Sequence, residues 1–263
     1  MIKLRICVFD TETTSVEKPF VYNIGYIIYD TTEKSILHRA DYIVEQVWHN
    51  KELFTTAYYA DKRELYISRM KGRKVKMEKL GYITQTMARQ FKDFSVEFAF
   101  AYNSSFDERV FEFNCEWFKI INPFDTIPII DIRGYVHQKI AFTPHFQRFC
   151  DLHKEYTESG NYSTTAETVY RYLADKIDFI EEHTALADSE IELEILNHCV
   201  SLGAEYGKVY KTYRSIPRKV DKVLRVKNVE GEITEFPYNS IMIYKEKDNK
   251  TRIILKKRVD KTE

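Results

Sequence analysis

The pattern of apolar and polar positions predicts a β-sheet in the first half of the chain. Several short runs are rich in β-branched and aromatic residues and are separated by polar turn residues such as "DTTEK". One run, "CVFDTETTS", is apolar until it ends in two acidic side chains. The predicted strands are residues 3–9, 21–30, 35–46, 96–103 and 126–132.

Helical spacing of apolar residues appears between and after these strands. Two helices are expected to start at capping boxes, Ser105 with Glu108 and Thr164 with Glu167. Strands that come first, followed by alternating helices and strands, predict an α/β fold with a mixed sheet flanked by helices. The predicted helices are residues 50–60, 80–94, 105–118, 144–155, 165–175 and 186–200.

The pattern changes after residue 204. Apolar and polar residues alternate there, with turn signals at Glu230–Gly231 and Asp248–Asn249, which predicts three or four short strands. We therefore expect two domains. Residues 1–204 form the main domain, and residues 205–263 form a small, basic, β-rich C-terminal appendage.

Charge is balanced overall but unevenly distributed. Residues 205–263 contain 16 Lys and Arg against 9 Asp and Glu, whereas the remaining residues contain 24 against 31. Residues 61–80 form a second basic segment, with 8 basic and 3 acidic side chains. Most basic segments are solvated surfaces, but these two would also suit a polyanionic substrate bound near an acidic site.

Length and composition favour a globular protein in the cytoplasm. The chain has 263 residues, of which 44% are hydrophobic, and no apolar run approaches the ~20 residues that a membrane span requires. The N-terminal segment also lacks the long apolar stretch of a signal peptide. We therefore expect a cytoplasmic protein with no membrane association.

The cysteines indicate reduced thiols rather than a metal site. They are scattered without a C-x-x-C pair, as is usual for core thiols in a reducing compartment. Cys150 and His153, with His145 nearby, lack a second ligand pair at zinc spacing. The four cysteines are Cys7, Cys115, Cys150 and Cys199.

The acids that end the first strand suggest a divalent cation. Asp10 and Glu12 are two residues apart, so they share one face at the C-terminal end of the strand, where α/β sheets bind ligands. Two carboxylates this close repel each other, and Mg²⁺ or Mn²⁺ would neutralise them. The pair alone is weak evidence for a metal site, because a D-x-E sequence also occurs at Asp188–Glu190.

Two other segments supply partners for this pair. In "AYNSSFD", Asn103 follows a buried strand and Asp107 lies in the first turn of a helix. In "EEHTALADSEI", His183 precedes Asp188 by five residues at the start of a late helix. Taken singly, each has an ordinary explanation: an acid that complements a helix dipole, or a surface histidine.

The three segments together, in this order, resemble the exonuclease motifs of the DEDDh family. That family includes the proofreading epsilon subunit of bacterial replicative polymerases, oligoribonuclease and ribonuclease T, and its members share a ribonuclease H-like fold. The resemblance spans roughly residues 4–200 and includes Ala185 within the His–Asp motif. Ser15 stands where the family often has glycine, and neither the 61–80 segment nor the appendage has a clear counterpart.

The resemblance implies a metal-dependent 3′–5′ exonuclease with a two-metal mechanism. It implies two Mg²⁺ ions, with Mn²⁺ as a substitute, and release of nucleoside 5′-monophosphates. His183 would be the general base. Thr11, Thr13 and Asn103 are candidate substrate contacts, although ordinary turn and cap hydrogen bonds would explain them equally well. The implied metal ligands are Asp10, Glu12, Asp107 and Asp188.

Single-stranded DNA 3′ ends are the expected substrate, with DNA favoured over RNA. The role would be proofreading, replication or repair, with a DNA polymerase or another replication protein as an open partner. Tyrosines near the start of the appendage, among lysines and arginines, would suit stacked bases or packing on the main domain. Alternatives are an RNA-directed exoribonuclease similar to oligoribonuclease, a non-catalytic nucleic-acid-binding subunit, and an α/β domain without Mg²⁺ binding.

Overall fold

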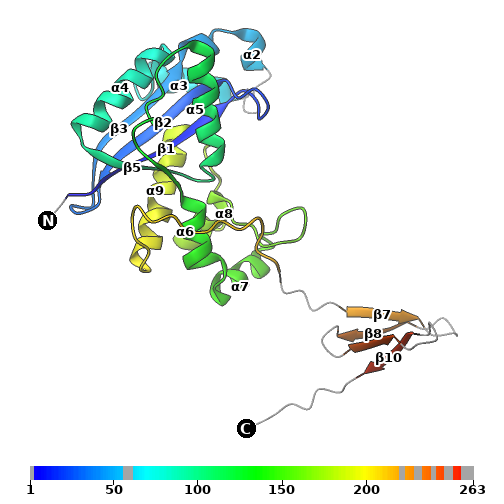
Figure 1. Ribbon diagram of the computed structural model, residues 1–263. Coiled ribbons are helices and arrows are strands. Elements are labelled where there is room, and N and C mark those ends of the chain that lie inside the picture. Colours follow the sequence, from blue (N-terminus) through cyan, green and yellow to red (C-terminus); the bar gives the residue numbers. More distant parts are fainter. Residues whose placement is uncertain are drawn as a thin grey trace. The chain divides into compact units, whose positions relative to one another are not determined.

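A mixed six-stranded sheet forms the centre of the first part of the chain in the computed structural model (Figure 1). The structure describes residues 3–55 and 62–218 and the backbone of four C-terminal strands. These parts divide into two compact units, Met1–Ile216 and Pro217–Glu263. Each unit is described by itself.

The sheet of the first unit has the order β4-β3-β2-β1-β5-β6. The pairs β1–β2 and β2–β3 are antiparallel, whereas β3–β4, β1–β5 and β5–β6 are parallel. The predicted α/β fold with a mixed sheet is therefore confirmed. The strands are β1 (Arg5–Thr13), β2 (Val21–Asp30), β3 (Ser35–Val44), β4 (Lys76–Glu78), β5 (Val96–Ala101) and β6 (Ile129–Asp131).

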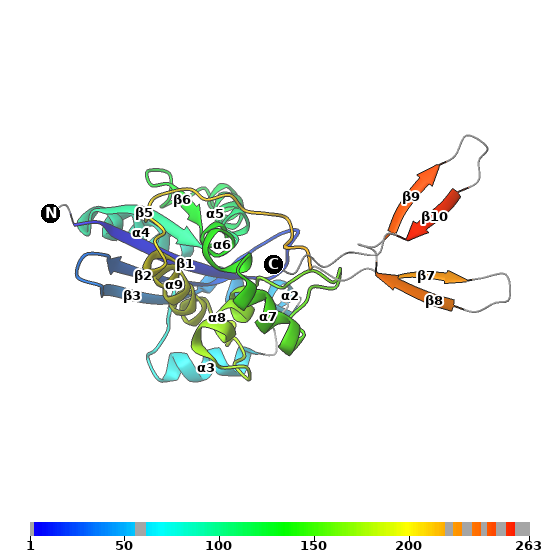
Figure 2. The same cartoon turned by 90° about the horizontal axis from the view of Figure 1, so that it is seen from below.

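Helices cover both faces of this sheet. Figures 1 and 2 show α9 on the opposite side of the sheet from α4 and α5. The helices are α1 (Glu45–Trp48), α2 (Lys51–Thr55), α3 (Arg63–Lys71), α4 (Leu80–Asp93), α5 (Ser105–Phe118), α6 (Ile132–Val136), a π-helical turn η2 (His137–Ala141), α7 (Pro144–His153), α8 (Ala166–Ala174) and α9 (Ala185–Ser201).

The alternation of side chains along β1 divides the core in two. Cys7 and Phe9 pack with α4 and α5, while Ile6 and Val8 pack with α9 and the helices before it. Asp10 and Glu12 continue the Ile6–Val8 side of the strand. The strand therefore directs both acids toward the layer that contains α9.

Most predicted elements are present, but both predicted capping boxes are wrong. α5 begins at Ser105 itself, and the preceding Ser104 uses its hydroxyl to donate to Glu108 Oε1 at 2.9 Å. The cap of α8 is Thr165, whose hydroxyl accepts from the backbone N–H of Thr168. Each true cap lies one residue away from the predicted one, so the S/T-x-x-E pattern marked the helix start without identifying its cap.

Some short elements were not predicted. The segment 50–60 was expected to be one helix, but α1 ends at Trp48 and α2 covers Lys51–Thr55, while 56–60 lie outside the described residues. β6 is shorter than predicted because its last residue, Asp131, caps α6 by accepting from the Arg133 backbone N–H at 2.8 Å. The other elements without a prediction are α3, β4, α6 and η2.

The first unit extends past the predicted boundary after residue 204. The Tyr135 hydroxyl donates to the Glu205 carbonyl at 2.9 Å, and the Tyr210 ring packs edge-on against Tyr135. Tyr206 packs similarly on Phe100. The tyrosines in this segment thus pack on the main body, and the unit ends at Ile216 rather than at 204.

The second unit is β-rich, as predicted. Two antiparallel pairs are described, β7–β8 and β9–β10. The predicted turns at Glu230–Gly231 and Asp248–Asn249 lie outside the described residues. The strands are β7 (Val223–Lys227), β8 (Ile233–Pro237), β9 (Ile241–Lys245) and β10 (Thr251–Leu255).

The cysteine prediction agrees with the structure. All four cysteines are free and buried. His145 Nδ1 lies 2.9 Å from the Tyr172 hydroxyl, and the His153 ring packs against Phe149. Across the described helices, none is long and apolar enough to cross a membrane.

Candidate active site

The first two acids of the site lie within β1 rather than after it. The strand continues to Thr13, with Asp10 paired to Gly25 and Glu12 paired to Asn23 on β2. Alternation along the strand gives both acids the same face. Asp10 is partly buried, and Glu12 is only 8% exposed.

The third acid comes from the start of α5. Asp107 is 3% exposed and accepts a hydrogen bond from the Thr11 hydroxyl at 2.6 Å. Burial raises the pKa of Asp107 to about 7, while the bond from Thr11 opposes that rise. Thr11 therefore contacts a predicted metal ligand through its side chain.

The N-terminus of α9 brings the histidine and the fourth acid to the same place. Ligand atoms of Glu12, His183 and Asp188 all lie within 4.8 Å of one another. The His183 backbone is also close enough to Asp188 to oppose the rise in the pKa of that carboxyl. His183 has a φ of +51°, a left-handed conformation that is uncommon for a residue with a side chain. Such a backbone is found where the surrounding contacts hold it in place.

The acids raise one another's pKa values. Burial raises the pKa of Asp10 well above its usual range, and repulsion from Asp107, Asp188 and Glu12 raises it further. Burial raises the pKa of Asp188 to about 8, helped by the nearby Glu181 and opposed by Lys62. The charge on these carboxyls is therefore unfavourable until a cation neutralises it.

The donor set suits a hard divalent cation. The Oδ1 atom of Asp188 is buried and has no hydrogen-bond partner within the described part of the chain. Buried carboxylate oxygens that converge without partners are the ligands that Mg²⁺ and Mn²⁺ prefer. The residues present thus fit the predicted cations.

Two predicted substrate contacts, Thr13 and Asn103, form hydrogen bonds with groups other than the four predicted metal ligands. The Thr13 hydroxyl donates to the Ser15 carbonyl at 3.3 Å, which is an ordinary turn bond. Asn103 is exposed, with a φ of +61°, and its backbone N–H donates to Asp131 Oδ1 at 2.9 Å. Asn103 also lines a cavity of about 320 Å³, together with Tyr102, Arg133 and Arg214.

Gly25 and Asn23 were not predicted, yet they determine how closely α9 approaches the sheet. A Cβ atom on Gly25 would lie 2.1 Å from the backbone nitrogen of Leu186. The Asn23 side chain is fully buried, and its Oδ1 accepts from the Ala185 backbone N–H at 2.9 Å. A buried asparagine and a glycine in an otherwise apolar strand were the available sequence signals.

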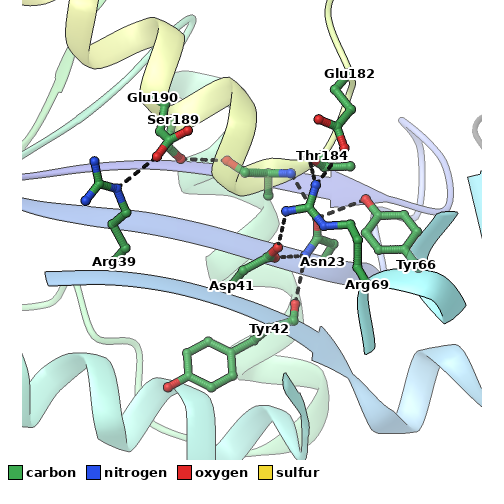
Figure 3. Close-up of polar contacts among 11 residues, drawn as sticks. Asn23, Arg39, Asp41, Tyr42, Tyr66, Arg69, Glu182, Thr184, Ser189 and Glu190 are labelled. Atoms are coloured by element: carbon green, nitrogen blue, oxygen red, sulfur yellow. Dashed lines mark hydrogen bonds and ion pairs between the residues drawn. The ribbon is translucent and has the colours of Figure 1, made fainter. Parts of the chain in front are cut away.

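Arg69 on α3 was also not predicted and holds the loop that carries His183. Its guanidinium donates to Asp41 Oδ2 at 2.8 Å, to Glu182 Oε1 at 2.6 Å and to the Thr184 hydroxyl at 3.1 Å. Figure 3 shows this guanidinium between the three acceptors, with Asn23 beside it. Lys62 adds a hydrogen bond from its ammonium group to the Glu182 carbonyl. These two side chains of the 61–80 segment therefore face the site.

Comparisons with known proteins identify the fold. No family model matches the chain, and no curated protein matches it. A solved structure described as 3′-end-specific recognition of a histone mRNA stem-loop by a 3′-exonuclease is similar, with a TM-score of 0.51 and 11% identity, covering 91% of this chain and 93% of that one. This match confirms the fold that the resemblance implied.

Weaker structural similarity extends to two other solved nucleases. The nuclease domain of 3′hExo, a DEDDh family member bound to rAMP, has a TM-score of 0.48 and 11% identity, with 82% of this chain and 98% of that chain covered. E. coli exonuclease I in complex with a dA16 oligonucleotide has a TM-score of 0.46 and 16% identity. That alignment covers 73% of this chain and 40% of exonuclease I.

Proposed function

We propose that this protein is a metal-dependent 3′–5′ exonuclease that releases nucleoside 5′-monophosphates from single-stranded 3′ ends. The observation that carries the proposal is the convergence of Glu12, His183 and Asp188 within 4.8 Å. Asp10 and Asp107 lie close enough to add to the same negative field. Three sequence segments far apart in the chain supply these groups.

In this proposal four carboxylates, those of Asp10, Glu12, Asp107 and Asp188, hold two divalent cations. Such cations, when bound, stabilise negative charge on the scissile phosphate and make water a better nucleophile. The Thr11 hydroxyl orients Asp107 through their 2.6 Å hydrogen bond. Thr11 is thus proposed to be a positioning residue for Asp107.

His183 is the proposed general base. Burial, aided by the positive charge of Lys62, lowers its pKa, so its imidazole is neutral near pH 7 and able to accept a proton. Glu181 Oε2 lies 3.7 Å from His183 Nδ1 and favours the protonated ring that forms afterwards. The proton comes from the attacking water. The bond that breaks joins phosphorus to the 3′ oxygen of the penultimate nucleotide.

The cavity beside Asn103 is the proposed path of the strand that leads to the site. Two of the residues that line it, Arg133 and Arg214, are cationic, and Tyr102 is aromatic. Phosphodiesters are attracted by such cations, and unpaired bases stack on aromatic rings, which suits a single strand. Asn103 connects the cavity to the first turn of α5, where Asp107 lies.

DNA is the proposed substrate, and RNA is the alternative. One similar solved structure is described as 3′-end-specific recognition of a histone mRNA stem-loop by a 3′-exonuclease. We therefore retain an RNA-directed 3′–5′ exonuclease as the second candidate function. A role in proofreading, replication or repair, with a polymerase or another replication protein as partner, stays a prediction.

The test is a nuclease assay with end-labelled strands and Mg²⁺. Matched DNA and RNA strands, duplexes and mismatched ends would be compared for release of mononucleotides. Asp188→Asn should reduce turnover by on the order of a thousandfold, because cation stabilisation of the transition state is worth several kcal/mol. Turnover at the wild-type rate in this variant would overturn the metal assignment. Absence of Mg²⁺-dependent release from every strand would overturn the proposed function.

A further inference from the structure

A fifth acid, Glu192, lies within the acidic cluster. It is one helical turn after Asp188 on α9, so both side chains project from the same face of that helix. The resemblance to exonuclease motifs gives Glu192 no role. The residue is nevertheless 3% exposed, which is unusual for a glutamate.

The Glu192 carboxyl is incompletely satisfied. The Tyr102 backbone is close enough to this group to oppose the rise that burial causes in its pKa. Its Oε2 atom, in contrast, is buried and has no hydrogen-bond partner within residues 3–55 and 62–218. No lysine or arginine in those ranges forms an ion pair with it. A buried carboxylate oxygen without a partner is costly, so a proton or a cation is expected to complete its surroundings.

The electrostatic neighbours of Glu192 are the predicted metal ligands. Repulsion from Asp107 and Asp188 acts on Glu192, and Glu192 in turn acts on Asp10. The carboxyl is therefore close enough to acids of β1, α5 and α9 to interact with them electrostatically. Its Oε2 and the Oδ1 of Asp188, one helical turn before it, are both buried without a hydrogen-bond partner in the described ranges.

We propose that Glu192 is a fifth carboxylate of the divalent-cation centre, with Oε2 contacting a cation directly or through one water. This inference rests on the proposed function, because it assumes that the other four acids bind cations. The competing interpretation is a permanently protonated glutamic acid that only packs under Tyr102. The proposed fifth ligand and the protonated acid differ in whether cation binding depends on a negative charge at Glu192.

Glu190 provides a matched control on the same helix. It lies two residues before Glu192, and its side chain is 46% exposed and paired with Arg39 at 2.9 Å. Figure 3 shows Glu190 directed toward Arg39. Glu190→Gln therefore removes one negative charge from α9 without changing the acidic cluster.

The experiment measures Mn²⁺ and Mg²⁺ binding by calorimetry on the full chain, with wild type, Glu192→Gln and Glu190→Gln. Glu192→Gln should weaken binding roughly 10–100-fold or remove one binding event, a loss typical of changes next to a metal. Glu190→Gln should bind like wild type. Equal affinity and stoichiometry in Glu192→Gln and wild type would overturn the inference and favour the protonated acid.

Thermal unfolding gives a second readout. The melting temperature of Glu192→Gln should rise less on addition of Mn²⁺ than that of wild type. If this variant is recovered unfolded, Glu192→Asp supplies a second test, because a carboxylate withdrawn by one methylene should also bind the cation less tightly. Failure of wild type to bind any divalent cation would overturn both the inference and the proposed function, whereas an unchanged Glu192→Gln would overturn the inference alone.

Discussion

Gly25 on β2 lies directly against the backbone of Leu186 in the first turn of α9. A Cβ atom on Gly25 would lie 2.1 Å from the Leu186 nitrogen, a distance that requires the helix to move. Gly25 is also the strand partner of Asp10. This contact therefore sets the distance between the acids of β1 and the residues that α9 supplies.

Gly25→Ala should disturb both stability and activity. Overpacking of a rigid backbone contact costs about 1–3 kcal/mol, and displacement of α9 would separate Asp188 from Glu12. Urea unfolding measures the first effect, and nucleotide release measures the second. Gly72→Ala is the control, because a Cβ there would lie 3.5 Å from the Ser68 carbonyl, an ordinary contact. Wild-type activity in Gly25→Ala would contradict this role.

The Arg69 bridge predicts a loss of turnover without a loss of substrate binding. Arg69→Lys keeps a positive charge beside Asp41 but cannot also reach Glu182 and Thr184 as the guanidinium does. The His183 loop should then be less well fixed, and misplaced catalytic groups cost on the order of tenfold to a hundredfold in kcat. Steady-state kinetics should show a lower kcat with KM little changed.

Arg39 on β3 gives the control for Arg69. Arg39 pairs with Glu190 at 2.9 Å, and both side chains are about half exposed. Exposed pairs of this kind contribute about 0–1 kcal/mol, so Arg39→Lys should leave turnover unchanged. An equal effect of the two substitutions would show that Arg69 has no special relation to His183.

The sequence predicts the site better than it predicts the contacts that assemble it. Asp10, Asp107 and Asp188 occur in local motifs at the starts and ends of elements, where the chain itself indicates a strand or helix terminus. Arg69 and Gly25 act across the sheet, on residues far away in the chain, and no local pattern reports such contacts. Their roles therefore required coordinates.

The sequence did not predict α3 and β4 for a related reason. α3, "RELYISRMK", buries only Tyr66 among its residues, so it lacks the apolar stripe by which an amphipathic helix is predicted. β4 has three residues and, among the described strands, pairs with β3 alone. Both are stabilised by tertiary contacts more than by their own sequence.

The raised pKa values predict how the stability of the metal-free protein depends on pH. Acids such as Asp107 and Asp188, with pKa values raised to about 7 and 8, hold protons in the folded state that the unfolded chain has already released. Stability therefore falls as pH rises from their ordinary values through the raised ones. With EDTA, the melting temperature should be lower at pH 8.5 than at pH 6.

Mg²⁺ should remove most of that difference, because it binds the ionised acids of the folded state only. Asp188→Asn should also flatten the pH dependence in EDTA, since it removes one of the groups that titrate. Melting curves at both pH values, with and without Mg²⁺, make the comparison. A melting temperature that rises from pH 6 to 8.5 in EDTA would contradict the proposed cluster of charges.

The dependence of kcat on pH should reflect the protonation of His183. A general base must be unprotonated, and burial together with Lys62 lowers the pKa of this histidine. The acidic limb of kcat at saturating Mg²⁺ should therefore lie below the usual histidine range. Lys62→Met should move the limb to higher pH, because it removes the positive charge that disfavours the imidazolium.

Two further variants complete the pH experiment. His183→Ala should lower kcat by about 10²–10⁴-fold, the usual contribution of a general base, and should abolish the limb. Lys71→Met, at the exposed end of α3, should leave the profile unchanged. Persistence of the same acidic limb in His183→Ala would assign it to another group.

The C-terminal unit should contribute electrostatic affinity for the strand. Residues 217–263 contain 13 Lys and Arg against 8 Asp and Glu. Deletion should begin after Ile216, because Tyr162 forms a β-bridge with that residue and the segment before it packs on the first unit. Without these basic groups, binding of a long single strand should weaken and depend less on salt, since each neutralised phosphate adds about 0.7 to the slope of log K against log salt.

Cleavage of very short oligonucleotides separates this role from a structural one. If residues 217–263 contribute only affinity along the length of a strand, the kcat and KM for a di- or trinucleotide should be the same with and without them. Fluorescence anisotropy at several salt concentrations would be measured on the long strand, and mononucleotide release on the short one. An unchanged salt slope on the long strand would mean that the basic groups of the second unit do not contact nucleic acid, and would point instead to a protein partner for it.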